Sequence, residues 1–329
     1  MLGPMIVCYL FLGGAGAGAC LVLAMLGLLA PRERVAVAID GTRMSVSRRV
    51  ASPRVVLRVP EPYRKLLAPG YATALMALGL GMVFLLADVG RADRVLLLLA
   101  NPTLSFVAVG AWSLAACAVL AALAAIAWGG FTRRASLRAV RALEVVLAAV
   151  TLVVMAYTGL LLQSLSAVPL WASPWLPVLF VLSSLSCGAA LVLVVAQFTG
   201  AAHAFSTVLA RLAAVDAVVI VLEAAVAAVF AGFALAGIGG DFVAGQTAQA
   251  LAASAEALVA GEAAWLFWGG FVLVGLAVPL VLDAVLASAR SERPPLAIVA
   301  SACILIGGFA MRFCVVEAGM HPLLAMTVG

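Results

Sequence analysis

The sequence predicts an all-α integral membrane protein with eight transmembrane helices. Of its 329 residues 66% are hydrophobic and only 10% are charged, and the mean hydropathy is +1.25. A soluble fold does not need so many apolar residues. Each of eight apolar segments has the length of about 20 residues that a membrane-spanning helix requires. Their approximate ranges are 5–30, 70–89, 103–130, 142–164, 176–199, 213–237, 264–287 and 296–317.

The basic residues orient these segments. Sixteen of the 19 Lys and Arg residues lie in the connections that follow the first, third, fifth and seventh segments, and nine of them lie within 31–69. Because cytoplasmic loops carry an excess of Lys and Arg, both termini are expected outside the cytoplasm. The net charge of +5 comes from these loops and does not indicate a nucleic-acid partner. We treat 1–329 as a single transmembrane domain.

Two connections on the cytoplasmic and outer sides have distinctive compositions. The basic loop 31–69 also contains prolines, and we expect an irregular segment that rests on anionic lipid headgroups. The alternative is a docking surface for a cytoplasmic partner. On the outer side, Gln246–Glu262 has a helix-forming composition and is expected to lie along the membrane surface.

The connection between the fourth and fifth segments is rich in proline and tryptophan. Pro169 and Pro174 prevent a continuous helix there. Trp171 and Trp175 have amphipathic rings, which favour the boundary between membrane and water.

Polar residues inside apolar segments are candidates for a functional site, because they are costly there. Helical rise places Tyr157 ~21 Å and Arg312 ~25 Å from the cytoplasmic boundary. Tyr9 and Asp88 fall at a similar level near the outer face, although they come from different segments. Such a set can bind the carbonyl groups of a quinone and exchange protons with it. The simpler alternative is that residues at a membrane boundary are usually polar.

A second set of acidic residues lies in the cytoplasmic half. Glu223 is ~18 Å deep, which favours either a proton relay or a hydrogen-bonded group between helices. Glu144, Asp216 and Asp283 are nearer the boundary, and we expect them to extend to the surface or to pair with neighbouring arginines.

The sequence indicates no metal cofactor of its own. The six cysteines lie within apolar segments and form no CxxC motif, so no zinc site or iron–sulfur cluster is expected. His203 and His321 are expected on opposite sides of the membrane, too far apart to hold one haem between them. No nucleotide or flavin fingerprint is evident. A redox role would therefore need a partner that carries the metals.

Four stretches of the sequence resemble the NrfD/PsrC family, the polysulfide-reductase type of membrane subunit. They are Tyr9–Ala19, Asp88–Trp112, Tyr157–Phe180 and Gly307–Pro322. Within them, the pattern Asp–x–Gly–Arg–x–x–Arg at Asp88 and the triplet Tyr–Thr–Gly at Tyr157 are the most specific pieces.

The resemblance implies eight helices in two four-helix bundles, in the cytoplasmic membrane of a bacterium or archaeon. It implies electron exchange between menaquinol or ubiquinol and a four-cluster ferredoxin-like iron–sulfur subunit on the outer face. A molybdopterin or multihaem catalytic subunit would complete the complex. It also assigns Tyr157 to the quinone pocket, with surroundings at Tyr9, Asp88, Arg91 and Arg312.

The leading hypothesis is therefore a quinol-exchanging membrane anchor of a respiratory oxidoreductase, which is not catalytic alone. One alternative is an ion-coupled secondary transporter, for which Glu223 would serve the coupling ion. Another is a purely structural anchor that has lost its quinone site.

Overall fold

The computed structural model describes residues 4–30, 33–37, 54–58, 61–89, 106–129, 137–165, 168–238, 245–261, 263–288 and 294–328. Within these residues, eight helices are long and apolar enough to cross a membrane. The predicted number of spans is confirmed, and most boundaries agree to within a few residues.

The spanning helices follow one another along the sequence. They are α1 (Pro4–Leu29), α2 (Glu61–Val89), α4 (Phe106–Gly129), α5 (Leu137–Gln163), α6 (Trp175–Phe198), α7 (Ser206–Leu235), the continuous pair η2 (Leu266–Ala277) and α9 (Val278–Ser288), and α10 (Pro294–Val328). The shorter elements are strands β1 (Glu33–Val37) and β2 (Arg54–Arg58), the 3-10 turn η1 (His203–Phe205) and helix α8 (Gly245–Val259).

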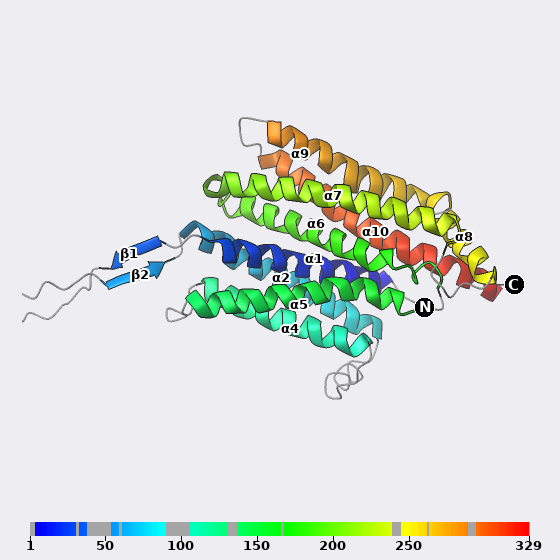
Figure 1. The fold of residues 1–329 in the computed structure, drawn as a ribbon, viewed down its shortest axis with the longest axis horizontal. Helices are drawn as coiled ribbons and strands as arrows, with labels where there is room; N and C mark the ends of the chain where they lie inside the picture. Colours follow the sequence, from blue (N-terminus) through cyan, green and yellow to red (C-terminus); the bar gives the residue numbers. More distant parts are fainter. Residues whose placement is uncertain are drawn as a thin grey trace, which may run out of the picture.

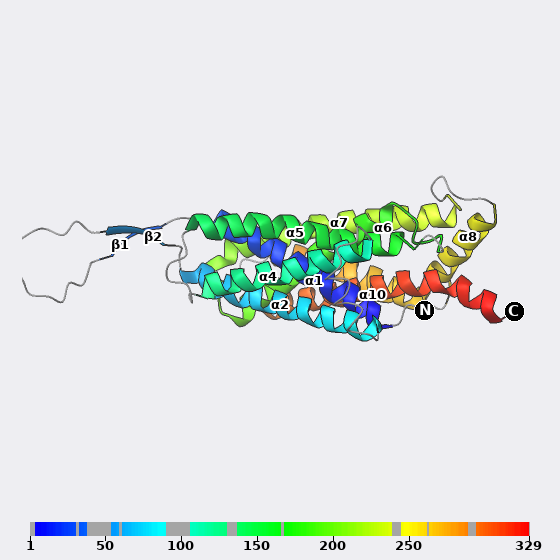
Figure 2. The same cartoon turned by 90° about the horizontal axis from the view of Figure 1, so that it is seen from below.

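Helix α1 lies at the centre of the assembly. It packs against α2 and α5 on one side and against α6 and α10 on the other, as Figure 1 shows. We call α1, α2, α4 and α5 the N-terminal group, and α6, α7, η2–α9 and α10 the C-terminal group. Both termini of the protein lie at one end of the helices, the terminal end. The β strands lie at the opposite end, the hairpin end (Figures 1 and 2).

Small residues let the two groups approach closely. A side chain at Gly18 would collide with the Ser184 backbone, and one at Gly188 with the Gly18 backbone, so α1 and α6 meet backbone to backbone. Gly275 and Gly307 make a similar contact between η2 and α10. Small residues at such positions let helices approach closely.

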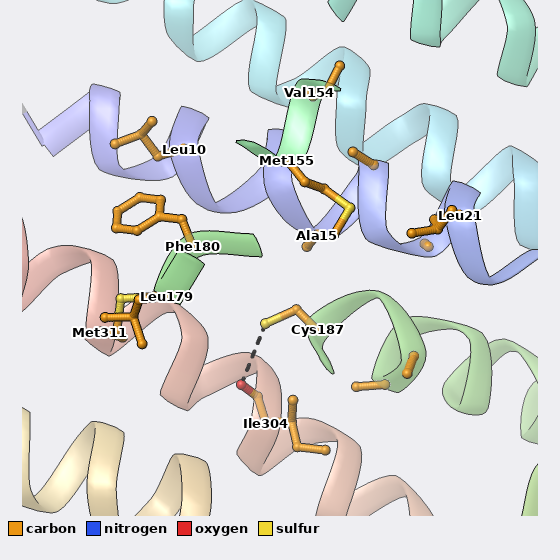
Figure 3. Close-up of a cluster of buried hydrophobic side chains, with 14 of the residues drawn as sticks. Leu10, Ala15, Leu21, Val154, Met155, Leu179, Phe180, Cys187, Ile304 and Met311 are labelled. Atoms are coloured by element: carbon orange, nitrogen blue, oxygen red, sulfur yellow. Dashed lines mark hydrogen bonds between the residues drawn. The ribbon is translucent and has the colours of Figure 1, made fainter. Parts of the chain in front are cut away.

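Large apolar side chains fill the space beside the contact between α1 and α6. Figure 3 shows Leu10, Phe180 and Met311 between α1, α6 and α10, where all three are buried. The thiol of Cys187 donates to the carbonyl oxygen of Ile304 at 3.8 Å. The described cysteines are all unbridged, and four of them, Cys20, Cys117, Cys187 and Cys314, are buried.

The described parts of the loop 31–69 are regular rather than irregular, while 38–53 lies outside the described residues. β1 and β2 pair antiparallel, with Glu33 opposite Arg58, and Figures 1 and 2 show this ribbon pointing away from the helices. Helix α2 begins at Glu61, about nine residues before the predicted span. Pro62 does not prevent this start, because a proline in the first helical turn lacks only an N–H that has no helical partner.

The connection after α5 is non-helical in its described residues, as its prolines predict, and Trp171 is buried within the protein. It is 2% exposed, and its indole N–H donates to the carbonyl oxygen of Val315 at 2.9 Å. A side chain at Gly319 would collide with the same indole. Trp171 therefore fastens this connection to α10. Trp175 is 38% exposed and stacks on Phe233, and the placement of both tryptophans at a membrane boundary remains a prediction.

Helix α8 confirms the helix expected in 246–262. It packs against α10 and α7 near the terminal end (Figure 1). Its position along a membrane surface remains a prediction.

Candidate functional site

The structure brings two of the predicted site residues together near the terminal end. Tyr9 of α1 and Tyr157 of α5 face one another closely enough for their phenol groups to interact. Both rings are buried, Tyr9 with 2% and Tyr157 with 6% of its surface exposed. Two phenols in an apolar interior can donate and accept hydrogen bonds without carrying a charge. Tyr157 is thus enclosed rather than open to lipid.

A glycine of α4 makes room for the Tyr157 ring. A side chain at Gly110 would overlap that ring, so α4 and α5 can pack at this level only because the position lacks a Cβ atom. Val109, beside Gly110, is 45% exposed, and Leu160, one turn after Tyr157, is 37% exposed. The phenol pair therefore lies just beneath the α4–α5 seam, whose outer side chains face the surroundings of the protein.

Arg312 forms a second cluster, between α1, α6 and α10. Its guanidinium donates to the hydroxyls of Ser183 at 3.1 Å and Ser184 at 2.8 Å, and to the carbonyl oxygen of Gly308 at 2.8 Å. The side chain has no exposed surface. The rings of Phe11 and Phe180 lie within 5.8 Å and 5.2 Å of the guanidinium carbon. Cation–π contacts of this kind stabilise a desolvated cation.

Glu223 of α7 belongs to the same cluster. The Ser183 hydroxyl and the Arg312 guanidinium both lie near enough to act on its carboxyl group. Since Ser183 also accepts from Arg312, this hydroxyl connects the guanidinium of α10 to the carboxyl group of α7. Both interpretations that the sequence allows for Glu223, a relay and a structural hydrogen bond, are compatible with this position.

The phenol pair and the Arg312 cluster lie on different faces of α1. Tyr9 and Gly14 are five residues apart, which turns them by about 140° around the helix. A Cβ at Gly14 would lie 3.0 Å from a guanidinium nitrogen of Arg312, whereas Tyr9 faces Tyr157. The level of these residues along the membrane normal was predictable, but their separation around α1 was not.

The remaining predicted residues are less informative. Asp88 is half-buried near the end of α2. Arg91 lies outside the described residues, as do the details of the His321 side chain.

The three acids nearest the cytoplasmic boundary are buried and do not extend to the surface, but the other expectation, pairing with a neighbouring arginine, is met in part because Arg141 acts electrostatically on Glu144. Glu144 is 0%, Asp216 2% and Asp283 9% exposed. Glu144 accepts a hydrogen bond from the indole N–H of Trp128 at 3.0 Å, and its other carboxyl oxygen has no partner among the described residues. Helical rise gives the depth of a side chain but not the side of the helix from which it projects, which explains the error.

Three residues of these clusters were not singled out from the sequence. Ser183 and Ser184 carry the contacts of Arg312, and Gly110 accommodates Tyr157. A signal for the serines existed: α6 has three serines and a cysteine within five positions, at Ser183–Cys187. In an apolar helix, such a row indicates a face turned towards other polar groups.

These features describe a multi-span membrane protein with buried polar clusters between its helices. The protein belongs to the family described as polysulphide reductase, NrfD, whose sequence model matches residues 2–323. It is 32% identical over 179 residues to the C subunit of polysulfide reductase from Wolinella succinogenes, and 32% identical over 180 residues to protein NrfD of Escherichia coli. Each match covers 54% of this protein, and 54% and 53% of the two relatives, so the alignments span about half of their length.

Proposed function

We propose that this protein is the membrane anchor of a respiratory oxidoreductase complex. It exchanges electrons between membrane quinol or quinone and an iron–sulfur partner outside the cytoplasm. In this arrangement the N-terminal and C-terminal groups are two four-helix bundles, and both termini face outward, as the distribution of Lys and Arg favours. Family membership supports the anchor over the ion-coupled transporter.

The observation that carries the proposal is the Tyr9–Tyr157 pair beneath the α4–α5 seam. A quinone ring is flat and apolar, with two carbonyl oxygens that accept hydrogen bonds, and a bound quinol supplies electrons and protons. Tyr157 would donate to one of these oxygens, and Tyr9 would hold the Tyr157 hydroxyl in place. Because the phenols are buried, their hydrogen bonds to a ligand would face no competition from water.

Access to this pair would open at the α4–α5 seam. The exposed side chains of Val109 and Leu160 flank the seam, and Gly110 leaves no side chain between α4 and the Tyr157 ring. A small displacement of α4 therefore suffices to admit a ring next to the phenol. The metals that accept the electrons would belong to partner subunits, of the four-cluster ferredoxin type and of the molybdopterin or multihaem type.

The substitution Tyr157→Phe tests the proposal, because it removes only the phenol oxygen. Quinol-dependent turnover of the complex should fall, while turnover with an artificial dye as donor should stay normal. A loss of similar size with both donors would show that Tyr157 supports the structure of the complex and not a quinone pocket. Retention of full quinol-dependent turnover would exclude the pocket as well.

The Arg312 cluster supports a second part of the proposal, a proton route through Glu223. Ser183 links Glu223 to Arg312, and Arg312 lies beside Gly14 of α1, the helix that carries Tyr9. Protons that enter from the hairpin end would pass from Glu223 towards the terminal end, and turnover would move charge across the membrane. Glu223→Gln should reduce the charge moved per electron in proteoliposomes that contain the complex. Glu256→Gln, an exposed carboxylate of α8, is the matched control. If the charge moved per electron is unchanged in Glu223→Gln, protons do not pass through Glu223.

A further inference from the structure

Asp216 of α7 is buried with no hydrogen-bond partner for either carboxyl oxygen among the described residues. It lies ten residues after Ser206, or ~15 Å from the start of the helix. Leaving a buried carboxyl group without partners is costly, so an unpaired carboxyl group of this kind calls for an explanation.

Another buried oxygen atom lies beside Asp216. The hydroxyl of Ser186 on α6 is near enough to act on the Asp216 carboxyl group, yet neither side chain has a partner at good hydrogen-bond geometry among the described residues. The hydroxyl of Ser301 on α10 is also buried and without a described partner. Ser301 lies one turn before Ile304, whose carbonyl oxygen accepts from Cys187, the residue after Ser186. Ser186 and Ser301 therefore lie on neighbouring turns of α6 and α10, and Ser186 is the one beside Asp216 of α7.

The electrostatic surroundings of Asp216 are acidic. Asp283 of α9 and Glu223 of α7 both act on its carboxyl group, and Cys187 is the titratable neighbour on α6. Arg312 makes its hydrogen bonds to Ser183, Ser184 and Gly308, nearer the terminal end. No described cationic side chain is thus placed to balance Asp216. A water molecule can satisfy unpaired oxygens, but it cannot offset the charge of a buried carboxylate.

We propose that Asp216 and Ser186 form a binding site for a small, hard monovalent cation of the Na⁺ class, with Asp283 at its entrance. Carboxylate and hydroxyl oxygens are hard ligands, which suit such a cation and not a soft transition metal. Asp283 is five residues from the end of α9, ~8 Å from the hairpin end, and would attract the cation towards Asp216. A cation among these oxygens would satisfy several unpaired atoms at once. The proposal does not depend on the quinone pocket, since its residues lie in the C-terminal group.

Thermal unfolding of the complex in mild detergent tests this site, with NaCl replaced by choline chloride at equal ionic strength. A ligand that binds only the folded state raises the apparent Tm, and the rise levels off at saturation. We expect a saturable rise with Na⁺ and a smaller one with K⁺. Asp216→Asn should abolish the response to Na⁺, whereas Glu256→Gln on the exposed face of α8 should retain it.

If Asp216→Asn does not fold, a milder variant still tests the proposal. Ser186→Ala removes one hydroxyl ligand and should raise the half-saturating Na⁺ concentration on the order of tenfold. Titration calorimetry with NaCl gives the same constant without unfolding. Equal responses to Na⁺ and choline in the unmodified complex would overturn the proposal. So would a response to pH alone, which would mean that Asp216 holds a proton, or an unaltered Na⁺ response in Asp216→Asn.

Discussion

Gly110→Ala is the sharpest perturbation that the structure offers for the phenol pair. The added methyl group would occupy the position of the Tyr157 ring. Since carbon atoms pack at about 3.5–4.0 Å, the ring must move by roughly 2 Å or α4 must move away. Displacements of about 1 Å at a reacting group can cost on the order of 100-fold in rate. We therefore expect quinol-dependent turnover to fall by at least about tenfold.

Gly79→Ala of α2 provides the matched control, because a Cβ atom there meets nothing within 4 Å. Both substitutions replace a helical glycine by alanine, and this replacement by itself stabilises a helix by about 0.5–1 kcal/mol. The assay compares quinol-dependent and dye-dependent turnover of the complex for both variants. Equal activities of Gly110→Ala and Gly79→Ala with quinol would refute the idea that the position of Tyr157 matters for turnover.

Three further predictions concern buried polar groups, each measured as thermal unfolding in detergent. Trp171→Phe removes the indole donor to the Val315 carbonyl oxygen and should lower the free energy of unfolding by about 0.5–1.5 kcal/mol; an unchanged Tm would show that this bond does not fasten the connection. Arg312→Gln should lower the free energy of unfolding on the order of 3 kcal/mol, because Ser183, Ser184 and Glu223 lose the buried cation they surround. The same change at exposed Arg211 should be nearly neutral. Glu144→Gln removes a buried charge but keeps an acceptor oxygen, so the Tm should stay equal or rise, and a clear fall would mean that the negative charge itself stabilises the helices.

The sequence predicted the helices well because their main determinant is local. A run of about 20 apolar residues must be helical in lipid, since no water is present to satisfy its backbone groups. The early start of α2 was missed because hydropathy marks the lipid-facing part of a helix and not its end: Glu61–Lys65 is polar yet helical. The strands β1 and β2 were missed for a related reason, since the surrounding prolines and arginines dominated the composition of the loop.

The candidate site was predictable in part. Depth follows from counting residues, and it placed Tyr9 and Tyr157 at one level, where the structure pairs them. Which residues share a face depends on how the helices rotate and cross, and no local pattern encodes this. The association of Arg312 with Ser183 and Ser184 and the burial of Asp216 therefore required coordinates.

Photoaffinity labelling with an azido-quinone tests the central claim most directly. The complex is illuminated in its membrane, and the labelled peptides of this protein are mapped by mass spectrometry. The proposed pocket predicts label on α4 near Gly110 and on α5 near Tyr157, prevented by excess unmodified quinone and reduced in Gly110→Ala. Label that competes with quinone but maps only to the C-terminal group would contradict the proposed pocket.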